Sequence, residues 1–422
     1  MKLPKRLTYQ YGYGSESDIT YRRNPDLNSR VRDDYVVLTP EINGTFTYRP
    51  TDWLEMTLEM IFEREIPLLE EDKITLPDGE IAFAEDRKFS LLIDQAFVMI
   101  KDFTDPLKIA LGRRNYEDER HWLYDTSMDI VSLEIKLNKL RAEALVGREV
   151  WQDLDLLTTE VTDRIDTYML YANYRGIEDI TLAGYAILRD DRTGKDGQPL
   201  LLGVRSQGMR TDSLSYWIEF AYMLGSDESS RDYRGYAFDI GGTYRIFGLP
   251  YNPNFTLAYA FASGDDNPNQ SKSNEFRQTG LQSNEAQFAG VSEFKIYGEA
   301  LDPELSNLMI ITTGLGFRPA PNVSLDFVYH YYRLDEIAEE IRSEGITALI
   351  NQVDTRQSKD VGSAFDIVFG YRNLFGIRRL GMDVRAGWFF PGNAFLRDDG
   401  DEGSTELRDA DTGTSVVAKF WW

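Results

Sequence analysis

The sequence VSLDFVYHY, residues 323–331, places a large apolar or aromatic side chain at every second position. Ser324, Asp326 and His330 stand between them, so one face of the segment is apolar and the other carries polar groups. A period of two is typical of a β-strand, in which successive side chains point to opposite faces. We therefore predict a strand with two chemically different faces.

The same alternation recurs along the whole chain. About 18 segments of roughly ten residues show it, which is the length of a tilted strand that crosses a membrane. They begin near residues 7, 35, 52, 88, 107, 128, 139, 164, 179, 198, 213, 232, 254, 307, 322, 362, 377 and 414.

The connections between these segments alternate in length. Short ones such as 50–52 and 138–139 are rich in turn-forming residues, whereas long ones cover regions such as 265–306 and 334–361. This alternation is typical of outer-membrane barrels, which have short periplasmic turns and long extracellular loops. We predict an all-β fold: one transmembrane antiparallel up-and-down β-barrel of about 18 strands in a single domain, residues 1–422. An even number of strands places both termini on the short-turn side.

A soluble all-β array is the alternative fold. A propeller would show an internal repeat, and a chain of sandwiches would show linkers, but the sequence has neither. Charged and polar residues on the second strand face would also be costly in a packed core. The chain ends in the alternating aromatic segment VVAKFWW (416–422), which is common for outer-membrane barrels.

The composition excludes several classes of function. The 422 residues include no cysteine, two histidines, 70 acids and 46 bases, for a net charge of −24. There are no thiol nucleophiles or disulfides, a multi-histidine metal site is improbable, and the acidic balance argues against nucleic-acid binding. Neither His121 nor His330 belongs to a recognisable catalytic set. We expect a protein that is not an enzyme and that has no cofactor and no metal.

No run of residues reaches the ~18–20 apolar positions of a membrane helix. The charged start of the chain, 1–6, is not followed by the apolar region of a signal peptide. A barrel in the outer membrane of a Gram-negative bacterium needs such a signal, so we expect that it has been removed. Outer-membrane lipid and lipopolysaccharide are then the expected surroundings.

The predicted lumen carries charges of both signs. Inward-facing arginines by strict alternation are Arg114, Arg189, Arg245, Arg372 and Arg385, and inward acids include Glu219 and Asp239. Arg113 and Arg148 have outward parity, but they lie at strand ends, where a bulge can redirect a side chain. Two interpretations remain open: Arg–acid ladders that brace a porin wall, or an arginine constriction that selects anions.

Two long connections stand out. Residues 276–307 are rich in Gln, Asn and Gly and too long for a plain hairpin, so they are expected either to fold inward as a plug or to form an extracellular flap. Residues 335–350 place isoleucine and leucine among acids, and we predict a short amphipathic helix there.

The chain resembles the alginate-export family of outer-membrane barrels. The resemblance rests on "FRQTGLQSN" (276–284), "GEALDPELSNL" (298–308), "ALGRRNYEDERHWLYD" (110–125), "RGYAFDIG" (234–241) and "LDFVYHYYR" (325–333). It implies an 18-stranded barrel that exports an anionic exopolysaccharide through an arginine-lined constriction. It also implies a monomer and a periplasmic tetratricopeptide-repeat lipoprotein as partner.

By the motifs of this family, Arg277 matches a loop arginine, and Arg113, with Arg114 beside it, matches a strand arginine. Arg385 matches a late-strand arginine, and Asp239 an acid near the constriction. With Arg148, a strand-end arginine that a bulge could turn inward, these six residues are the predicted pore site.

The first hypothesis for function is passive export of an anionic, alginate-like exopolysaccharide. The alternative is a general or substrate-specific porin for small solutes. A sheath around a partner or an outer-membrane enzyme is a third, weaker hypothesis. The balance of arginine and acid at the narrowest part of the lumen discriminates between the first two.

Overall fold

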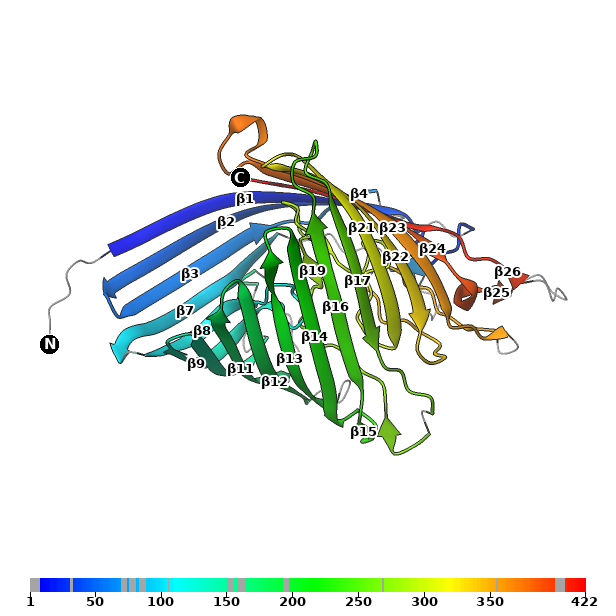
Figure 1. Ribbon diagram of the computed structural model, residues 1–422, viewed down its shortest axis with the longest axis horizontal. Coiled ribbons are helices and arrows are strands. Elements are labelled where there is room, and N and C mark those ends of the chain that lie inside the picture. Colours follow the sequence, from blue (N-terminus) through cyan, green and yellow to red (C-terminus); the bar gives the residue numbers. More distant parts are fainter. Residues whose placement is uncertain are drawn as a thin grey trace.

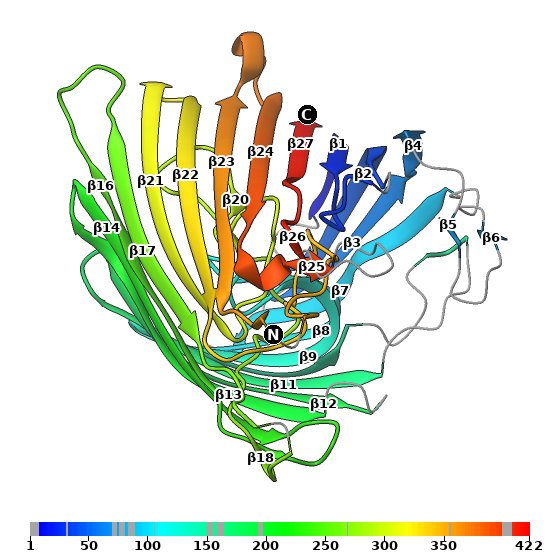
Figure 2. The same ribbon diagram turned by 90° about the vertical axis from the view of Figure 1, so that its right-hand side faces the viewer.

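The computed structural model describes residues 8–30, 33–69, 74–75, 81–82, 89–104, 106–149, 155–157, 164–192, 197–267, 269–353, 356–398 and 407–422. The basic start of the chain, 1–6, lies outside this part. The described residues form a closed antiparallel barrel of 18 strands, and Figures 1 and 2 show it from two sides.

The wall consists of long strands that follow one another around the ring. They are β1 (Thr8–Arg23), β2 (Tyr35–Thr51), β3 (Leu54–Glu63), β7 (Ser90–Thr104), β8 (Leu107–Glu117), β9 (Asp125–Leu137), β10 (Leu140–Arg148), β11 (Ile165–Ile177), β12 (Ile180–Asp191), β13 (Gln198–Thr211), β14 (Leu214–Ser226), β16 (Tyr236–Arg245), β17 (Asn254–Ala262), β21 (Leu308–Ala320), β22 (Val323–Leu334), β23 (Asp360–Arg372), β24 (Gly381–Pro391) and β27 (Gly413–Trp421).

The first and last strands close the ring. β1 pairs with β2 along 8–22 and with β27 along 16–23, both antiparallel. Because every wall strand has two neighbours, the barrel leaves little unpaired backbone, as a membrane requires. The exception is the first part of β1, which projects past the end of β27 (Figure 1).

The predicted strands agree with the observed ones. Their starting points are correct to within about four residues. The short turns at 52–53, 138–139, 178–179, 212–213 and 321–322 occur as predicted, and the two short-side connections at 246–253 and 373–380 are longer than expected. The turn predicted at 104–106 includes residue 105, which lies outside the described residues. The alternation of short turns and long loops is confirmed, and both ends of the wall lie on the short-turn side.

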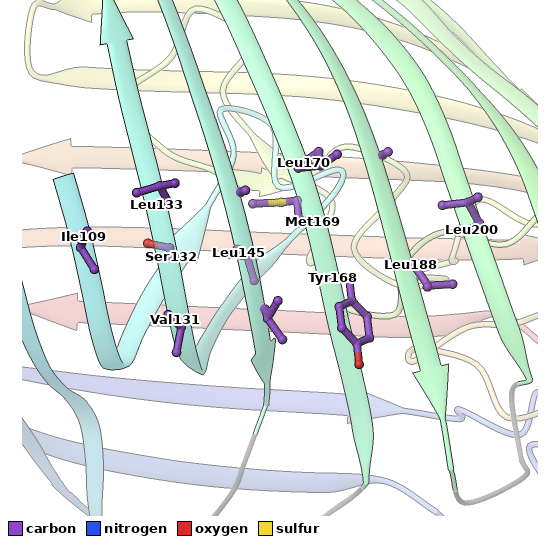
Figure 3. A pocket seen from close by; sticks show the side chains of 13 residues that line it. Ile109, Val131, Ser132, Leu133, Leu145, Tyr168, Met169, Leu170, Leu188 and Leu200 are labelled. Atoms are coloured by element: carbon purple, nitrogen blue, oxygen red, sulfur yellow. The ribbon is translucent and has the colours of Figure 1, made fainter. Parts of the chain in front are cut away.

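The two faces of the wall differ as the sequence predicts. On β14, Ile218 and Phe220 are exposed, whereas Glu219 and Ala221 between them are buried. Exposed apolar side chains recur around the outside and form the surface that faces lipid. Figure 3 shows part of it, an apolar groove of about 550 Å³ lined by side chains of β8 to β13.

No helix in the described part of the chain is long and apolar enough to cross a membrane. The helix predicted at 335–350 is wrong, because this loop has no helical turn. Its backbone is bonded to other loops instead: Arg342 O accepts from Glu304 N, and Thr347 N donates to Pro25 O. These long-range bonds replace the i to i−4 bonds of a helix.

Candidate functional site: the lumen and its plug

The connection between β17 and β21 folds into the barrel. We call residues 276–307 the plug. Its small hairpin of β19 (Glu285–Ala286) and β20 (Phe294–Lys295) lies within the ring of strands (Figure 2). Large apolar side chains of the plug are almost fully buried: Phe276, Leu281, Phe288, Phe294, Tyr297, Leu301 and Leu305. Of the two alternatives from the sequence, the inward-folded loop is the one observed.

The tip of the plug reaches the periplasmic end of the wall. Arg318, near the end of β21, donates to the carbonyl oxygens of Phe288 (2.9 Å) and Ala289 (2.6 Å). Arg372, the last residue of β23, donates to Val291 O. Because both arginines lie beside short turns and the plug enters from the loop side, it spans the height of the wall.

Asp239 is the centre of the contact between plug and wall. This carboxylate on β16 is 1% exposed. It accepts hydrogen bonds from Arg120 Nη2 (2.9 Å), Trp217 Nε1 (2.8 Å) and Tyr297 Oη (3.1 Å). These donors come from the β8–β9 loop, β14 and the plug, so one buried acid joins three elements. Three donors satisfy the charge that burial would otherwise make costly.

Arg385 also binds the plug. Its Nη1 donates to Glu285 Oε1 (3.1 Å), and its Nε lies 3.7 Å from Glu299 Oε1. Glu299 is fully buried in the plug, outside the wall strands. Burial raises the pKa of Glu299 to about 7, although the charge of Arg385 acts in the opposite direction.

The β8–β9 loop, 118–124, enters the lumen as well. Its Asp118 accepts from Arg205 Nη1 (2.6 Å), and the Nε of the same arginine donates to Glu219 on β14. All three side chains are nearly inaccessible. Sequence reasoning did not select Arg205, although it shares inward parity with Leu201 on β13.

Arg277 lies near the extracellular end, at a small pocket between the plug and the wall. It donates to Tyr233 Oη and its guanidinium lies 5.5 Å from the centre of that ring. Arg189 of β12 and Arg342 of the β22–β23 loop line the same pocket, which has a volume of about 80 Å³. Asp191 and Glu304 are the acids in its lining. Each arginine also has an acid beside the pocket: Glu149 lies 2.5 Å from Arg189, Glu228 3.9 Å from Arg277 and Glu275 3.8 Å from Arg342.

The two predicted pore arginines of β8, Arg113 and Arg114, have different surroundings. Arg114 lies over Tyr116 (5.2 Å) and Phe97 (5.9 Å), and the Tyr116 hydroxyl bonds to inward-facing Glu143. Arg113 is buried and donates to Glu149 O (2.6 Å).

A backbone irregularity precedes Arg113. Gly112 has φ = 116°, and a Cβ there would lie 2.2 Å from Ala96 O, so glycine is required for the local twist.

Arg148 lies on the outer side of the wall. It has the parity of Val146, which is 47% exposed, and its Nη2 lies 2.6 Å from Asp166 Oδ1. Arg192 binds the other oxygen of Asp166 (2.8 Å). This set lies at the extracellular end of the barrel and does not face the plug.

The charges of the lumen are largely balanced. Inward arginines of the described wall and loops with an acidic partner include Arg120 with Asp239, Arg189 with Glu149, Arg205 with Glu219, Arg318 with Asp326, Arg372 with Asp383 and Arg385 with Glu285. Of these pairs, Arg385 with Glu285 joins the wall to the plug, and Arg318 and Arg372 also donate to plug carbonyl oxygens. The small pocket at Arg277 brings three arginines together, each with an acid within 4 Å.

A closed 18-stranded barrel with an apolar outer surface and an inserted loop defines an outer-membrane channel of a Gram-negative bacterium. Comparison of the sequence with known families shows which kind of outer-membrane channel this is. A family model described as "Alginate export" matches residues 3–408, and the chain belongs to that family.

Two curated relatives agree with this assignment. The chain is 25% identical over 380 residues to the alginate production protein AlgE of Azotobacter vinelandii, covering 76% of this chain and 75% of the relative. It is 24% identical over 338 residues to AlgE of Pseudomonas aeruginosa, covering 68% and 66%.

Among solved structures, OccAB2 of Acinetobacter baumannii superimposes with a TM-score of 0.61 at 11% identity, over 98% of both chains. The outer membrane protein opdK of Pseudomonas aeruginosa gives 0.59 at 9% identity, also over 98% of both chains. These two likenesses concern the fold.

Proposed function

We propose that this barrel is the outer-membrane export channel for an anionic exopolysaccharide of the alginate type. Membership of the alginate export family and the two AlgE relatives support the substrate class. The structural observation that supports it is the pocket of Arg189, Arg277 and Arg342 at the extracellular end of the plug. Guanidinium groups bind carboxylates in a bidentate manner, and a uronate polymer carries one carboxylate per sugar.

In this proposal the polymer passes beside the plug, and arginines contact its carboxylates weakly and in succession. Weak contacts at several sites allow a bound chain to move on. We assign this contact to Arg277 and, on the inner wall, to Arg114 and Arg385. Arg113 and Asp239 support the wall and the plug. We assign Arg148 to the outer rim because of its parity with Val146.

Two further parts of the proposal concern assembly. A monomer is sufficient, because the pairing of β1 with β27 completes the pore within one chain. A periplasmic tetratricopeptide-repeat lipoprotein would dock on the short-turn side. There, residues 8–14 of β1 pair with β2 but extend beyond β27, and Tyr9, Tyr11 and Tyr13 are exposed.

A small-solute porin is the competing function, and the balanced charges around the plug favour it. Reversal potentials in planar bilayers under a salt gradient separate the two. We expect the parent channel to prefer anions and Arg277→Ala and Arg385→Ala to weaken that preference. Arg378→Ala, at an exposed position of the 373–380 turn, is the matched control and should leave it unchanged. A cation-selective channel that does not respond to either lumen substitution would favour the porin.

A further inference from the structure

A histidine and two carboxylates converge where the β8–β9 loop meets the plug. One ligand atom from each of Glu117, His121 and Asp125 lies within 4.8 Å of the others. Glu117 ends β8 and Asp125 begins β9, and these two residues are register partners. His121 lies at the middle of the connecting loop and folds back onto them.

Two acids directly opposite each other on paired strands repel. The negative charge of Asp125 is stabilised by two neighbours. Its Oδ2 lies 3.1 Å from His121 Nδ1 and accepts a hydrogen bond from Ser283 Oγ (2.7 Å). Glu117 is exposed and has no hydrogen bond or ion pair among the described residues. A further positive charge between the two strands would therefore be stabilised by both carboxylates.

We propose that Glu117, His121 and Asp125 form a binding site for a divalent transition-metal ion such as Zn²⁺. Imidazole nitrogen and carboxylate oxygen are ordinary zinc ligands with bonds of about 2.0–2.2 Å. Two ligands of one ion at such bond lengths lie roughly 3–3.5 Å apart. The 3.1 Å between His121 Nδ1 and Asp125 Oδ2 has this separation. Water would complete the coordination.

The plug supplies the outer contacts of this site. Ser283 Oγ donates to Asp125 Oδ2 (2.7 Å), and the backbone N–H groups of Ser283 and Asn284 donate to His121 O. A metal ion would thus fix the β8–β9 loop against the base of the plug hairpin. This role is separate from polymer export, and either proposal can fail without the other.

The test is titration of the purified full-length barrel with ZnCl₂, followed by calorimetry. We expect one saturable site in the parent and at least a tenfold loss of affinity in His121→Gln and in Glu117→Gln. Glu178→Gln makes the same chemical change in the exposed turn between β11 and β12 and should bind as the parent does. Glu117 is exposed, so its substitution is not expected to disturb folding.

A second measurement concerns stability. Binding to the folded state alone raises the unfolding temperature. Zn²⁺ should raise it in the parent and in Glu178→Gln, a chelator should reverse the rise, and Glu117→Gln should show none. The proposal is wrong if the parent has no saturable site, or if His121→Gln and Glu117→Gln bind Zn²⁺ as tightly as the parent.

Discussion

Arg205 is a single side chain on which two elements of the lumen depend. It joins Asp118 of the β8–β9 loop to Glu219 of β14, and the three groups are nearly inaccessible to water. Removing one partner of a buried ion pair leaves uncompensated charge, which costs about 3–5 kcal/mol. We expect Arg205→Ala to lower the unfolding temperature of the barrel clearly, as followed by the shift of the folded band on electrophoresis.

Arg175 provides the control for this prediction. Its Nη2 lies 3.6 Å from Glu119, and both side chains are largely exposed. Exposed pairs contribute about 0–1 kcal/mol. An equal loss of stability in Arg175→Ala and Arg205→Ala would contradict a special role for the buried pair.

Glu299 makes the stability of the plug dependent on pH. Burial raises its pKa to about 7 from an ordinary value of 4.5, with Arg385 opposing the shift. The native state therefore holds the proton more tightly than the unfolded state. This contribution to stability is complete below about pH 4.5 and is lost as the pH rises through 7.

We expect the parent to lose more stability between pH 5 and pH 8 than Glu299→Gln does, since the amide does not titrate. Unfolding temperatures at the two pH values measure the difference. Parallel losses in the two proteins would show that Glu299 is not the group responsible.

At the scale of elements, the plug restricts the lumen without contributing to the wall. None of the strand pairs that close the barrel includes residues 276–307. We expect a variant in which a short Gly-Ser linker replaces 276–305 to assemble and to conduct several-fold more current in planar bilayers. Unchanged conductance in a correctly assembled variant would mean that the plug does not limit the passage of ions.

The wall strands and the plug differ in how well the sequence predicts them. Wall strands were predictable because membrane and lumen impose a strict period of two, as on β14. The plug was predictable as an inward loop from its length, but only as one of two alternatives. The partners of Asp239 were not predictable, because Arg120, Trp217 and Tyr297 come from three distant segments.

The helix predicted at 335–350 is wrong for a similar reason. Apolar spacing among acids indicated a helix, but the backbone of this loop finds its partners in other loops. Alternation alone would have placed Arg205 on the inner face. It does not indicate which inward arginines are neutralised by acids from a loop, and so the charge of the lumen could not be deduced from the sequence.

At the scale of the whole molecule, a closed barrel of the alginate export family encloses a plug held by paired charges. Such pairs position the plug and add little net charge to the passage. The pocket at Arg277 brings three arginines together at the extracellular end of the plug. We propose that an anionic polymer crosses this barrel, with its carboxylates in contact with these arginines.

The most direct test is the interruption of single-channel current by polymer added on the periplasmic side of a planar bilayer. Polyuronate chains, driven by voltage toward the extracellular side, should produce transient blocks. A neutral glucan of equal length should not, and Arg277→Ala should make the blocks rarer, whereas Arg378→Ala should not. Equal blocking by the neutral glucan, or no blocking by the polyuronate, would contradict export of an anionic polymer through this barrel.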